Sequence, residues 1–530
     1  MDVFDYIIVG AGSAGCVLAA RLAERNRYSV CVVEAGPRDW HPMIHVPAGW
    51  MKLMRNARFN WMYETEPSEW TGGRAIPVPR GKTLGGSSSI NGNIFNRGAA
   101  SDFNHWAQLG NLGWDYDSVL PLFRRLEEWL GPEDTARRGT AGPLKITPSN
   151  WSDPLCDAFL AGAQTLGIPL NPDYNAGSQF GAAYAQRTIA SGRRQSAATA
   201  FLRPQLRNPT LQVLTNAHVT EIILDGKTAT GVTLTRRGQQ QQIRARREVI
   251  LCGGVINTPQ LLQLSGIGDP EHLKSIGIDV HHALPGVGRN LRDHYTPRFT
   301  ARVTGTQTFN ERTRGLALAA ETVKWLAGRP SVLSLPSTAC YAFAKSDPIL
   351  EESDLQITFM PASYKEGNQS QLDDEPGMTL AAWQQRPESL GTVLARTSSA
   401  FDKPEIRPNY LSAPEDRRVL LAGLKLARKL MRTPPMQPYF AGEIYPGDAI
   451  QSDEDLLGTA RDRGTTTFHM IGTCRMGPQA QSDTVVDNHL KVHGLQNLRV
   501  ADASIMPTMP AANTNAAALM IGEMAASLLD

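Results

Sequence analysis

Three glycines near the start of the chain have the spacing of a turn that binds phosphate groups. Gly10, Gly12 and Gly15 form a G-x-G-x-x-G motif. The first glycine permits a tight turn, the second lets the backbone approach a pyrophosphate, and the third lets a helix pack closely on a strand. The N-terminus of that helix would present free N–H groups and a positive dipole end to the phosphates. Because glycine triplets also occur in ordinary loops, the elements around this motif decide its meaning.

Those elements are the two strands and the helix of a dinucleotide-binding unit. Residues 6–9 and 30–33 are short apolar runs that suit strands buried on both faces, and residues 18–22 carry apolar side chains at helical spacing. Glu34 follows the second run, 19 residues after Gly15, where a carboxylate can accept hydrogen bonds from ribose hydroxyls. The unit predicts dinucleotide binding. It does not separate FAD from NAD, although its place at the start of the chain favours FAD.

Composition and charge exclude several classes of protein. The chain has 530 residues, 41% of them hydrophobic, which is enough for more than one domain with a sizeable core. Lys and Arg number 53 and Asp and Glu 51, so the net charge of +2 gives no basis for nucleic-acid binding. We find no run of 18 apolar residues and no signal segment before the first strand, and expect neither a membrane span nor secretion. The six cysteines form no C-x-x-C pair, which fits a reducing compartment, and we predict no metal site.

A second segment, residues 80–98, has the composition of a backbone that lies against a flat ligand. From Arg80 to Asn93 it reads RGKTLGGSSSINGN, rich in glycine, serine and asparagine. Such residues let a main chain approach a ligand closely. A flexible linker has a similar composition, but Leu84 and Ile90 frame this segment with apolar side chains, which favours a ligand-binding loop.

The middle of the chain predicts a hairpin and a second strand–turn–helix unit. Residues 219–224 and 231–235 alternate in the manner of two paired strands. Residues 249–252 form another buried strand, which would return to the first sheet. We expect Thr258 to cap the helix that follows, with Pro259 as its first residue.

Residues 297–455 have a different pattern of apolar residues from the segments before them, and this pattern predicts most of a second domain. Three alternating segments, 355–359, 378–383 and 391–395, indicate an antiparallel sheet, and residues 414–431 indicate one long helix. Two shorter helices are predicted earlier in the chain, at 113–130 and 154–166.

Several ordered blocks of the chain resemble the glucose–methanol–choline (GMC) family of FAD oxidoreductases. They are the glycine motif, residues 80–98, residues 254–268 (GVINTPQLLQLSGIG), and the pair 468–477 (FHMIGTCRMG) and 500–507 (VADASIMP). The resemblance extends over essentially the whole chain and is weakest in residues 300–450. Val255 is a small departure, because the family usually has a small or hydroxyl residue or proline there.

The resemblance implies an α/β fold of two domains with the active site between them. A doubly wound, Rossmann-like FAD-binding domain would comprise residues 1–145, 190–297 and 466–530. A substrate-binding domain with an antiparallel sheet and helices would comprise residues 146–189 and 298–465.

The resemblance also implies which residues hold FAD. The segment at Val219 would reach the adenine, Asp502 and Ala503 the pyrophosphate and ribityl chain, and residues 91–93 the flavin ring. Some members tether FAD through a histidine just before the asparagine of this loop; here that position is Ile90, so we expect non-covalent FAD. The full predicted set is Gly10, Gly12, Ser13, Ala14, Gly15, Glu34, Ala35, Arg80, Gly85, Asn91, Gly92, Asn93, Ile94, Val219, Asp502, Ala503, Asn513 and Thr514.

His469 and Asn513 match the family's two catalytic positions. By composition alone, His469 would be interpreted as a buried core histidine, but the match, with Asn513 44 residues further on, favours catalysis. A neutral imidazole, with an ordinary pKa near ~6.5, can take the proton of an alcohol. The amide of Asn513 can donate to the substrate oxygen as it becomes alkoxide-like, and the flavin can take the hydride. Some members carry histidine at the second position, so this chain belongs to the His–Asn subtype.

Three reactions are open to such a protein. The first is an FAD-dependent alcohol dehydrogenase that passes electrons to a quinone or another redox carrier. The second is an oxidase that passes them to oxygen, and the third is a hydroxynitrile lyase, which the absence of a signal segment disfavours.

The substrate is predicted only by class. Residues 41–47 (HPMIHVP) and 491–494 (KVHG) resemble bacterial members that oxidise sugars, polyols and glycols, L-sorbose among them. We therefore expect a primary alcohol oxidised to an aldehyde. Choline would require a carboxylate in an aromatic cage, and the sequence identifies none. We expect a cytoplasmic protein, with peripheral attachment to the inner membrane left open.

Overall fold

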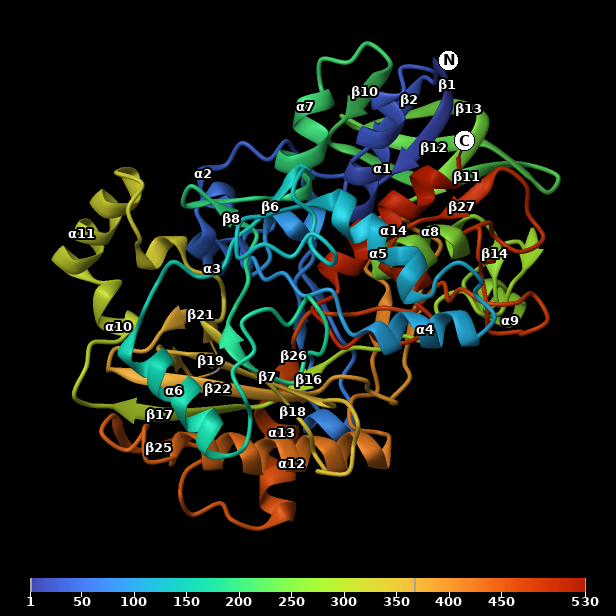
Figure 1. The fold of residues 1–530 in the computed structure, drawn as a ribbon. Coiled ribbons are helices and arrows are strands. Elements are labelled where there is room, and N and C mark those ends of the chain that lie inside the picture. The colour runs from blue at the N-terminus through green and yellow to red at the C-terminus, as the bar shows by residue number, and fades with distance from the viewer. Residues whose placement is uncertain (1, 367, 530) are drawn as a thin grey trace.

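Two large sheets dominate the computed structural model, which describes residues 2–366 and 368–529 (Figure 1). The first sheet lies near both chain termini, and the second lies at the opposite side of the molecule. Each sheet has its own hydrophobic core. This arrangement agrees with the predicted α/β fold. The exact division into an FAD-binding and a substrate-binding domain stays a prediction.

The first sheet is mostly parallel and contains the predicted dinucleotide-binding unit. β1 (Asp2–Val9) lies between β2 (Val30–Val33) and the carboxyl half of β13 (Gln239–Leu251). β10 (Leu211–Leu214) extends the sheet beyond β2, and β27 (Leu498–Val500) pairs with β13. The predicted return of the second strand–turn–helix unit to this sheet is therefore confirmed at β13.

A β-meander and two helices complete this half of the molecule. β11 (Ala217–Asp225) and β12 (Thr228–Arg236) form the predicted antiparallel hairpin, which continues onto the amino half of β13. α1 (Ser13–Glu24) packs against α14 (Asn515–Ser527), so the start and end of the chain share one core.

α8 (Gly254–Leu264) corrects the prediction for the second glycine turn. The helix begins four residues before Thr258, so Pro259 lies inside it rather than at its first position. An internal proline cannot donate to the carbonyl four residues earlier. Here that carbonyl belongs to Val255, and the hydroxyl of Thr473 donates to it at 2.7 Å. The side chain of Thr473 thus replaces the missing hydrogen bond.

The second sheet is antiparallel and has helices on one face. α12 (Pro414–Met431), with the bounds expected from the sequence, and α6 (Pro154–Thr165) pack against its strands. The strands in spatial order are β25 (Phe440–Tyr445), β17 (Arg298–Val303), β22 (Gly377–Gln384), β19 (Leu355–Met360), β18 (Cys340–Ala344) and β7 (Gly181–Tyr184).

Two predicted elements differ from the structure. The strand expected at 391–395 is β23 (Thr392–Leu394), which pairs with β24 (Glu405–Arg407) outside the main antiparallel sheet. The helix expected at 113–130 is α5 (Tyr116–Leu126) and is followed by a strand, β5 (Glu127–Trp129). The backbone leaves helical geometry at Glu127, and the carboxylate of this residue belongs to a buried ion-pair network.

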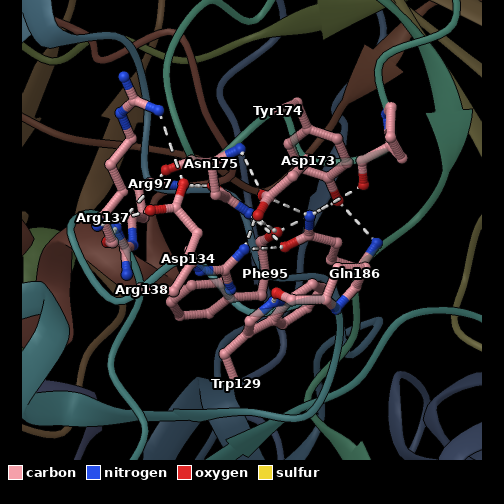
Figure 2. Close-up of polar contacts among 12 residues, drawn as sticks. Phe95, Arg97, Trp129, Asp134, Arg137, Arg138, Asp173, Tyr174, Asn175 and Gln186 are labelled. Carbon is pink, nitrogen blue, oxygen red and sulfur yellow. Dashed lines mark hydrogen bonds and ion pairs between the residues drawn. The ribbon is translucent and has the colours of Figure 1, made fainter.

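That network fixes the loop that was predicted to face a flat ligand. Arg97, at the end of the loop, pairs with Glu127 at 2.5 Å, and Arg138 pairs with the same carboxylate at 2.8 Å. Arg138 also contacts Asp173 at 2.6 Å and Gln186 at 3.0 Å (Figure 2). Because these charges are buried and paired, loss of one partner would leave another unpaired, which is costly.

Candidate active site

One large cavity lies between the two sheets. Its volume is about 390 Å³, and its walls include the carboxyl ends of β1, β2 and β13 and one face of the second sheet. Open α/β sheets bind ligands at the carboxyl ends of their strands. Most predicted site residues line it: Gly10, Gly12, Ser13, Ala14, Glu34, Ala35, Arg80, Asn91, Gly92, Ile94, Val219, His469, Asp502, Ala503, Asn513 and Thr514.

Three predicted residues do not line the cavity but build its walls. A Cβ at Gly15 would lie 2.1 Å from the carbonyl oxygen of Gly10, so this glycine permits α1 to pack on the strand. Gly85 has φ +86°, and its N–H donates to the carbonyl of Ala11 at 2.8 Å. Asn93 is buried with φ +60°. These residues shape the backbone rather than present atoms to a ligand.

Glu34 follows β2, and each oxygen of its carboxylate accepts a hydrogen bond from a backbone N–H. Its Oε2 accepts from the N–H of Ala11 at 3.0 Å, and its Oε1 accepts from the N–H of Gly36 at 2.8 Å. Burial raises the pKa of this carboxyl to about 7. Each carboxylate oxygen can accept a second hydrogen bond, so Glu34 can still accept bonds from a ligand in the cavity that it lines.

The first turn of α1 is suited to phosphate groups. Gly12, Ser13 and Ala14 line the cavity, and this helix start has neither a side-chain cap nor an acidic residue. The hydroxyl of Ser13 donates to Oδ1 of Asn515 at 2.7 Å, which brings the start of α14 beside the start of α1. N–H groups without a side-chain cap at a helix N-terminus fit a pyrophosphate.

Asp502 contributes by holding the second glycine turn. Its Oδ2 accepts from the N–H of Gly254 at 2.8 Å and from the hydroxyl of Thr258 at 2.7 Å. Its Oδ1 accepts from the N–H of Ser504 at 2.8 Å. Burial raises the pKa of Asp502. The predicted cofactor residue therefore also anchors the start of α8.

Every second residue on the strands of the second sheet points into the other end of the cavity. Thr379, Ala381 and Trp383 of β22 line it, as do Thr358 of β19 and Tyr341 of β18. The intervening residues of these strands face the helices and form the second core. Two carboxylates are among the cavity-lining residues, Glu34 and Asp502, and both belong to the nucleotide-binding half.

His469 and Asn513 meet inside the cavity although they are far apart in the sequence. Nε2 of His469 lies 2.9 Å from Nδ2 of Asn513. Phe468, just before the histidine, has φ +71°, and the N–H of His469 donates to Oδ1 of Asp293 at 2.8 Å. The phenol of Tyr341 donates to Oδ1 of Asn513 at 3.1 Å. A strained backbone and a buried carboxylate thus hold the histidine, and a phenol orients the amide.

The profiles of the GMC oxidoreductase family match residues 4–296 and 387–522 of the chain. The chain belongs to this family. An alcohol dehydrogenase [acceptor] of Pseudomonas putida is 38% identical over 99% of this chain and 96% of its own length. An oxygen-dependent choline dehydrogenase of Brucella ovis is 37% identical over 98% of this chain and 94% of its own.

Solved structures of other GMC oxidoreductases have the same fold over their whole length. Pyridoxine 4-oxidase from Mesorbium loti has a TM-score of 0.90 and 29% identity, covering 99% of each chain. A formate oxidase of Aspergillus oryzae has a TM-score of 0.92 and 27% identity, covering 99% of this chain and 98% of its own. This protein is thus a flavoenzyme of the alcohol dehydrogenase or oxidase type, and its cofactor is FAD.

Hydrogen-bond polarity fixes the tautomer of the candidate base in this GMC oxidoreductase. Nε2 of His294 lies 2.7 Å from the carbonyl of Gln385, which can only accept, so Nε2 carries the proton and Nδ1 is an acceptor. Nδ1 of His294 lies 3.0 Å from Nδ1 of His469, which must therefore donate. In neutral His469 this leaves Nε2 unprotonated, facing Asn513.

Electrostatics keep this base neutral. Burial, repulsion from His294 and repulsion from Arg80 together lower the pKa of His469 well below its ordinary value. Burial also lowers the pKa of His294 to about 4. Both imidazoles are consequently uncharged at neutral pH, as a base that must accept a proton requires.

Sequence reasoning missed several residues of this site. His294 and Asp293 are in a different part of the chain from His469. The pairing of β16 (Tyr295–Thr296) with β26 (Thr465–Thr466) and a bridge between Arg292 and Ile471 bring the two segments together. Tyr341 and Trp383 are aromatic residues within apolar strands, where the sequence gives no sign of a site. Their side-chain direction on the strand is the feature that could have identified them.

Proposed function

We propose that this GMC oxidoreductase oxidises the primary alcohol of a small sugar, polyol or glycol, such as L-sorbose, to the aldehyde. Electrons leave to a quinone or another redox carrier rather than to oxygen. The observation that carries the proposal is the pair of His469 Nε2 and Asn513 Nδ2, 2.9 Å apart in the cavity, in which Nε2 is unprotonated and can take up a proton. The likeness to an alcohol dehydrogenase [acceptor] supports the non-oxygen acceptor.

The two side chains divide the work on the hydroxyl. Nε2 of His469 accepts the proton as the O–H bond breaks, and Nδ2–H of Asn513 donates to the oxygen as it gains charge. The phenol of Tyr341 donates to Oδ1 of Asn513, and this bond orients the amide so that its N–H groups point into the cavity. Bound FAD supplies the acceptor for the hydride that leaves carbon, so that a C=O bond forms.

The charge distribution of the cavity supports a neutral substrate over choline. Among the described residues that line it, the carboxylates are Glu34 and Asp502, and both belong to the nucleotide-binding half. Arg298 lines the substrate end, and burial lowers its pKa. A quaternary ammonium would find no carboxylate at that end among the described residues that line the cavity. A neutral hydroxyl compound needs no such partner.

Anaerobic reduction of the flavin by a panel of alcohols tests the proposal. The panel comprises glycols, glycerol, L-sorbose, simple primary alcohols and choline, each measured with a dye acceptor and with oxygen in separate arms. We expect bleaching by neutral primary alcohols and turnover with the dye. Turnover with oxygen at the dye-linked rate would make the protein an oxidase, as its solved relatives are named. Flavin that stays oxidised with every alcohol would favour the lyase.

A further inference from the structure

α11 (Gly315–Leu326) is an amphipathic helix whose apolar face is turned away from the protein. Leu316, Ala319, Val323 and Leu326 recur at the spacing of one helical face. Leu316 is 90% exposed, Val323 66% and Leu326 72%. The helix projects from the side of the molecule (Figure 1). Surface helices normally turn such a face to the core, so an outward apolar stripe indicates a partner.

The opposite face of the helix fixes this orientation. The buried carboxylate of Glu321 accepts from the N–H of Val332 at 3.0 Å, and its backbone carbonyl accepts from the hydroxyl of Ser331 at 2.9 Å. The indole N–H of Trp325 donates to the carbonyl of Gly192 at 2.7 Å. The helix cannot rotate to bury its apolar stripe without breaking these bonds.

Positive charge lies near the carboxyl end of α11. Arg329 follows the helix, and the guanidinium of Arg193 lies 5.8 Å from the ring centroid of Trp325. At the other end, Arg314 is neutralised by Asp374 at 2.8 Å. An anionic phospholipid surface would accept the apolar side chains among its acyl chains and the cations among its headgroups.

The apolar stripe is joined to one wall of the cavity through short elements. α11 packs on η5 (Val332–Ser334), which contacts η1 (Pro47–Gly49) at the start of α3 (Trp50–Leu53). Trp50 on α3 lines the cavity and is partly exposed. We propose that α11 docks the enzyme on anionic phospholipid bilayers, through the side of the molecule on which Trp50 lines the cavity. Docking on a membrane would favour the proposed quinone acceptor, but the docking itself is tested by binding, without turnover.

Co-flotation with vesicles tests the docking helix. The holoenzyme is mixed with vesicles of phosphatidylcholine, with and without phosphatidylglycerol. We expect it to float with the anionic vesicles, and the triple variant Leu316→Gln, Val323→Gln, Leu326→Gln to partition into them roughly tenfold less or weaker still. Ile349→Gln is the matched control, because Ile349 is an 85% exposed apolar residue elsewhere, and it should float like the parent.

Other outcomes would overturn the proposal. A parent that stays with the aqueous fraction, or a triple variant that floats like the parent, would do so. So would a dimer of the parent that the triple variant converts to monomers, since the stripe would then be a self-interface. Flavin content and dye-linked activity, measured on the same samples, should be unchanged in the variants. If the triple variant fails to fold, Leu316→Gln alone replaces it, with a smaller expected loss of binding.

Discussion

At the scale of single residues, the contrast between His469 and Asn513 tests the mechanism. His469→Ala removes the base, and flavin reduction by alcohol should slow by ~10²–10⁴-fold. Asn513→Ala removes one donor to the developing negative charge and should slow it by roughly 10²-fold or more. The double variant should lose less than the sum of the two free-energy changes, because both groups act on the same oxygen. Anaerobic stopped-flow spectroscopy measures all three.

Flavin content is the control for these variants. The N–H of His469, which bonds to Asp293, survives substitution by alanine, so the variants should purify with the parental amount of FAD. A His469→Ala enzyme that reduces its flavin at the parental rate would show that another residue is the base.

The pH dependence of reduction should reveal how His294 acts. The pKa of His469 is depressed, so the rate should rise through a pH well below 6.5 and stay level at neutral pH. In His294→Leu the repulsion from His294 is gone, whereas burial and Arg80 still lower this pKa, so the acid limb should move to higher pH but stay below 6.5. The plateau rate should also fall. Loss of the group that orients a catalytic histidine can cost ~10⁴-fold. The fall should be smaller here, because the hydroxyl of Thr467 still lies 2.7 Å from Nδ1 of His469 and can accept its hydrogen bond.

His294→Asn separates orientation from packing. Its amide oxygen can still accept from Nδ1–H of His469, so the rate plateau should recover more than in His294→Leu. An acid limb at the same pH in the parent and His294→Leu would contradict the electrostatic coupling between the two histidines.

At the scale of elements, α8 depends on a hydrogen bond from a turn that is distant in the sequence. Thr473→Val removes the hydroxyl that donates to the carbonyl of Val255, and the buried acceptor is left without a partner. Loss of such a partner costs about 1–3 kcal/mol of folding free energy. For a chain of this size each kcal/mol lowers the apparent melting temperature by ~2–4 °C or less, so we expect a fall of a few degrees. Differential scanning fluorimetry measures it, and Thr473→Ser, which keeps the hydroxyl, should melt near the parent.

The same helix shows where prediction from sequence succeeds and fails. The unit around Gly10 was predictable because strand, glycine turn, helix and Glu34 are local and each has a steric or electrostatic requirement. The start of α8 was not, because Thr473 supplies the bond that lets Pro259 lie inside a helix, and no local pattern records such a partner.

The candidate site divides in the same way. Residues in ordered motifs, such as Gly12, Asn91 and His469, could be named from the sequence and line the cavity. His294 and Tyr341 could not, because their places depend on strand pairing between distant segments and on which way a side chain points from its strand.

At the scale of the whole molecule, the cavity is assembled from segments spread along the chain. Gly12, Asn91, Val219, Gly254 and Ala503 all line it, although they come from the start, middle and end of the sequence. No helix among the described residues is long and apolar enough to cross a membrane. A cofactor held by such a cavity depends on the global fold, so excess FAD should raise the melting temperature in proportion to the logarithm of its concentration.

We predict that FAD is bound non-covalently, because residue 90 is an isoleucine. The side chain of Ile90 lines the cavity where related enzymes with tethered flavin have a histidine, and a hydrocarbon cannot form that bond. Unfolding by acid or heat separates the segments that hold FAD, so all of the flavin should appear in the supernatant after the protein is precipitated. Absorbance of the supernatant and of the redissolved pellet measures the two fractions. Parallel precipitation of Ile90→His controls for trapped flavin, since only that variant has an imidazole available for tethering at this position. Yellow colour that stays with the washed, denatured parent protein would show a covalent bond through another residue.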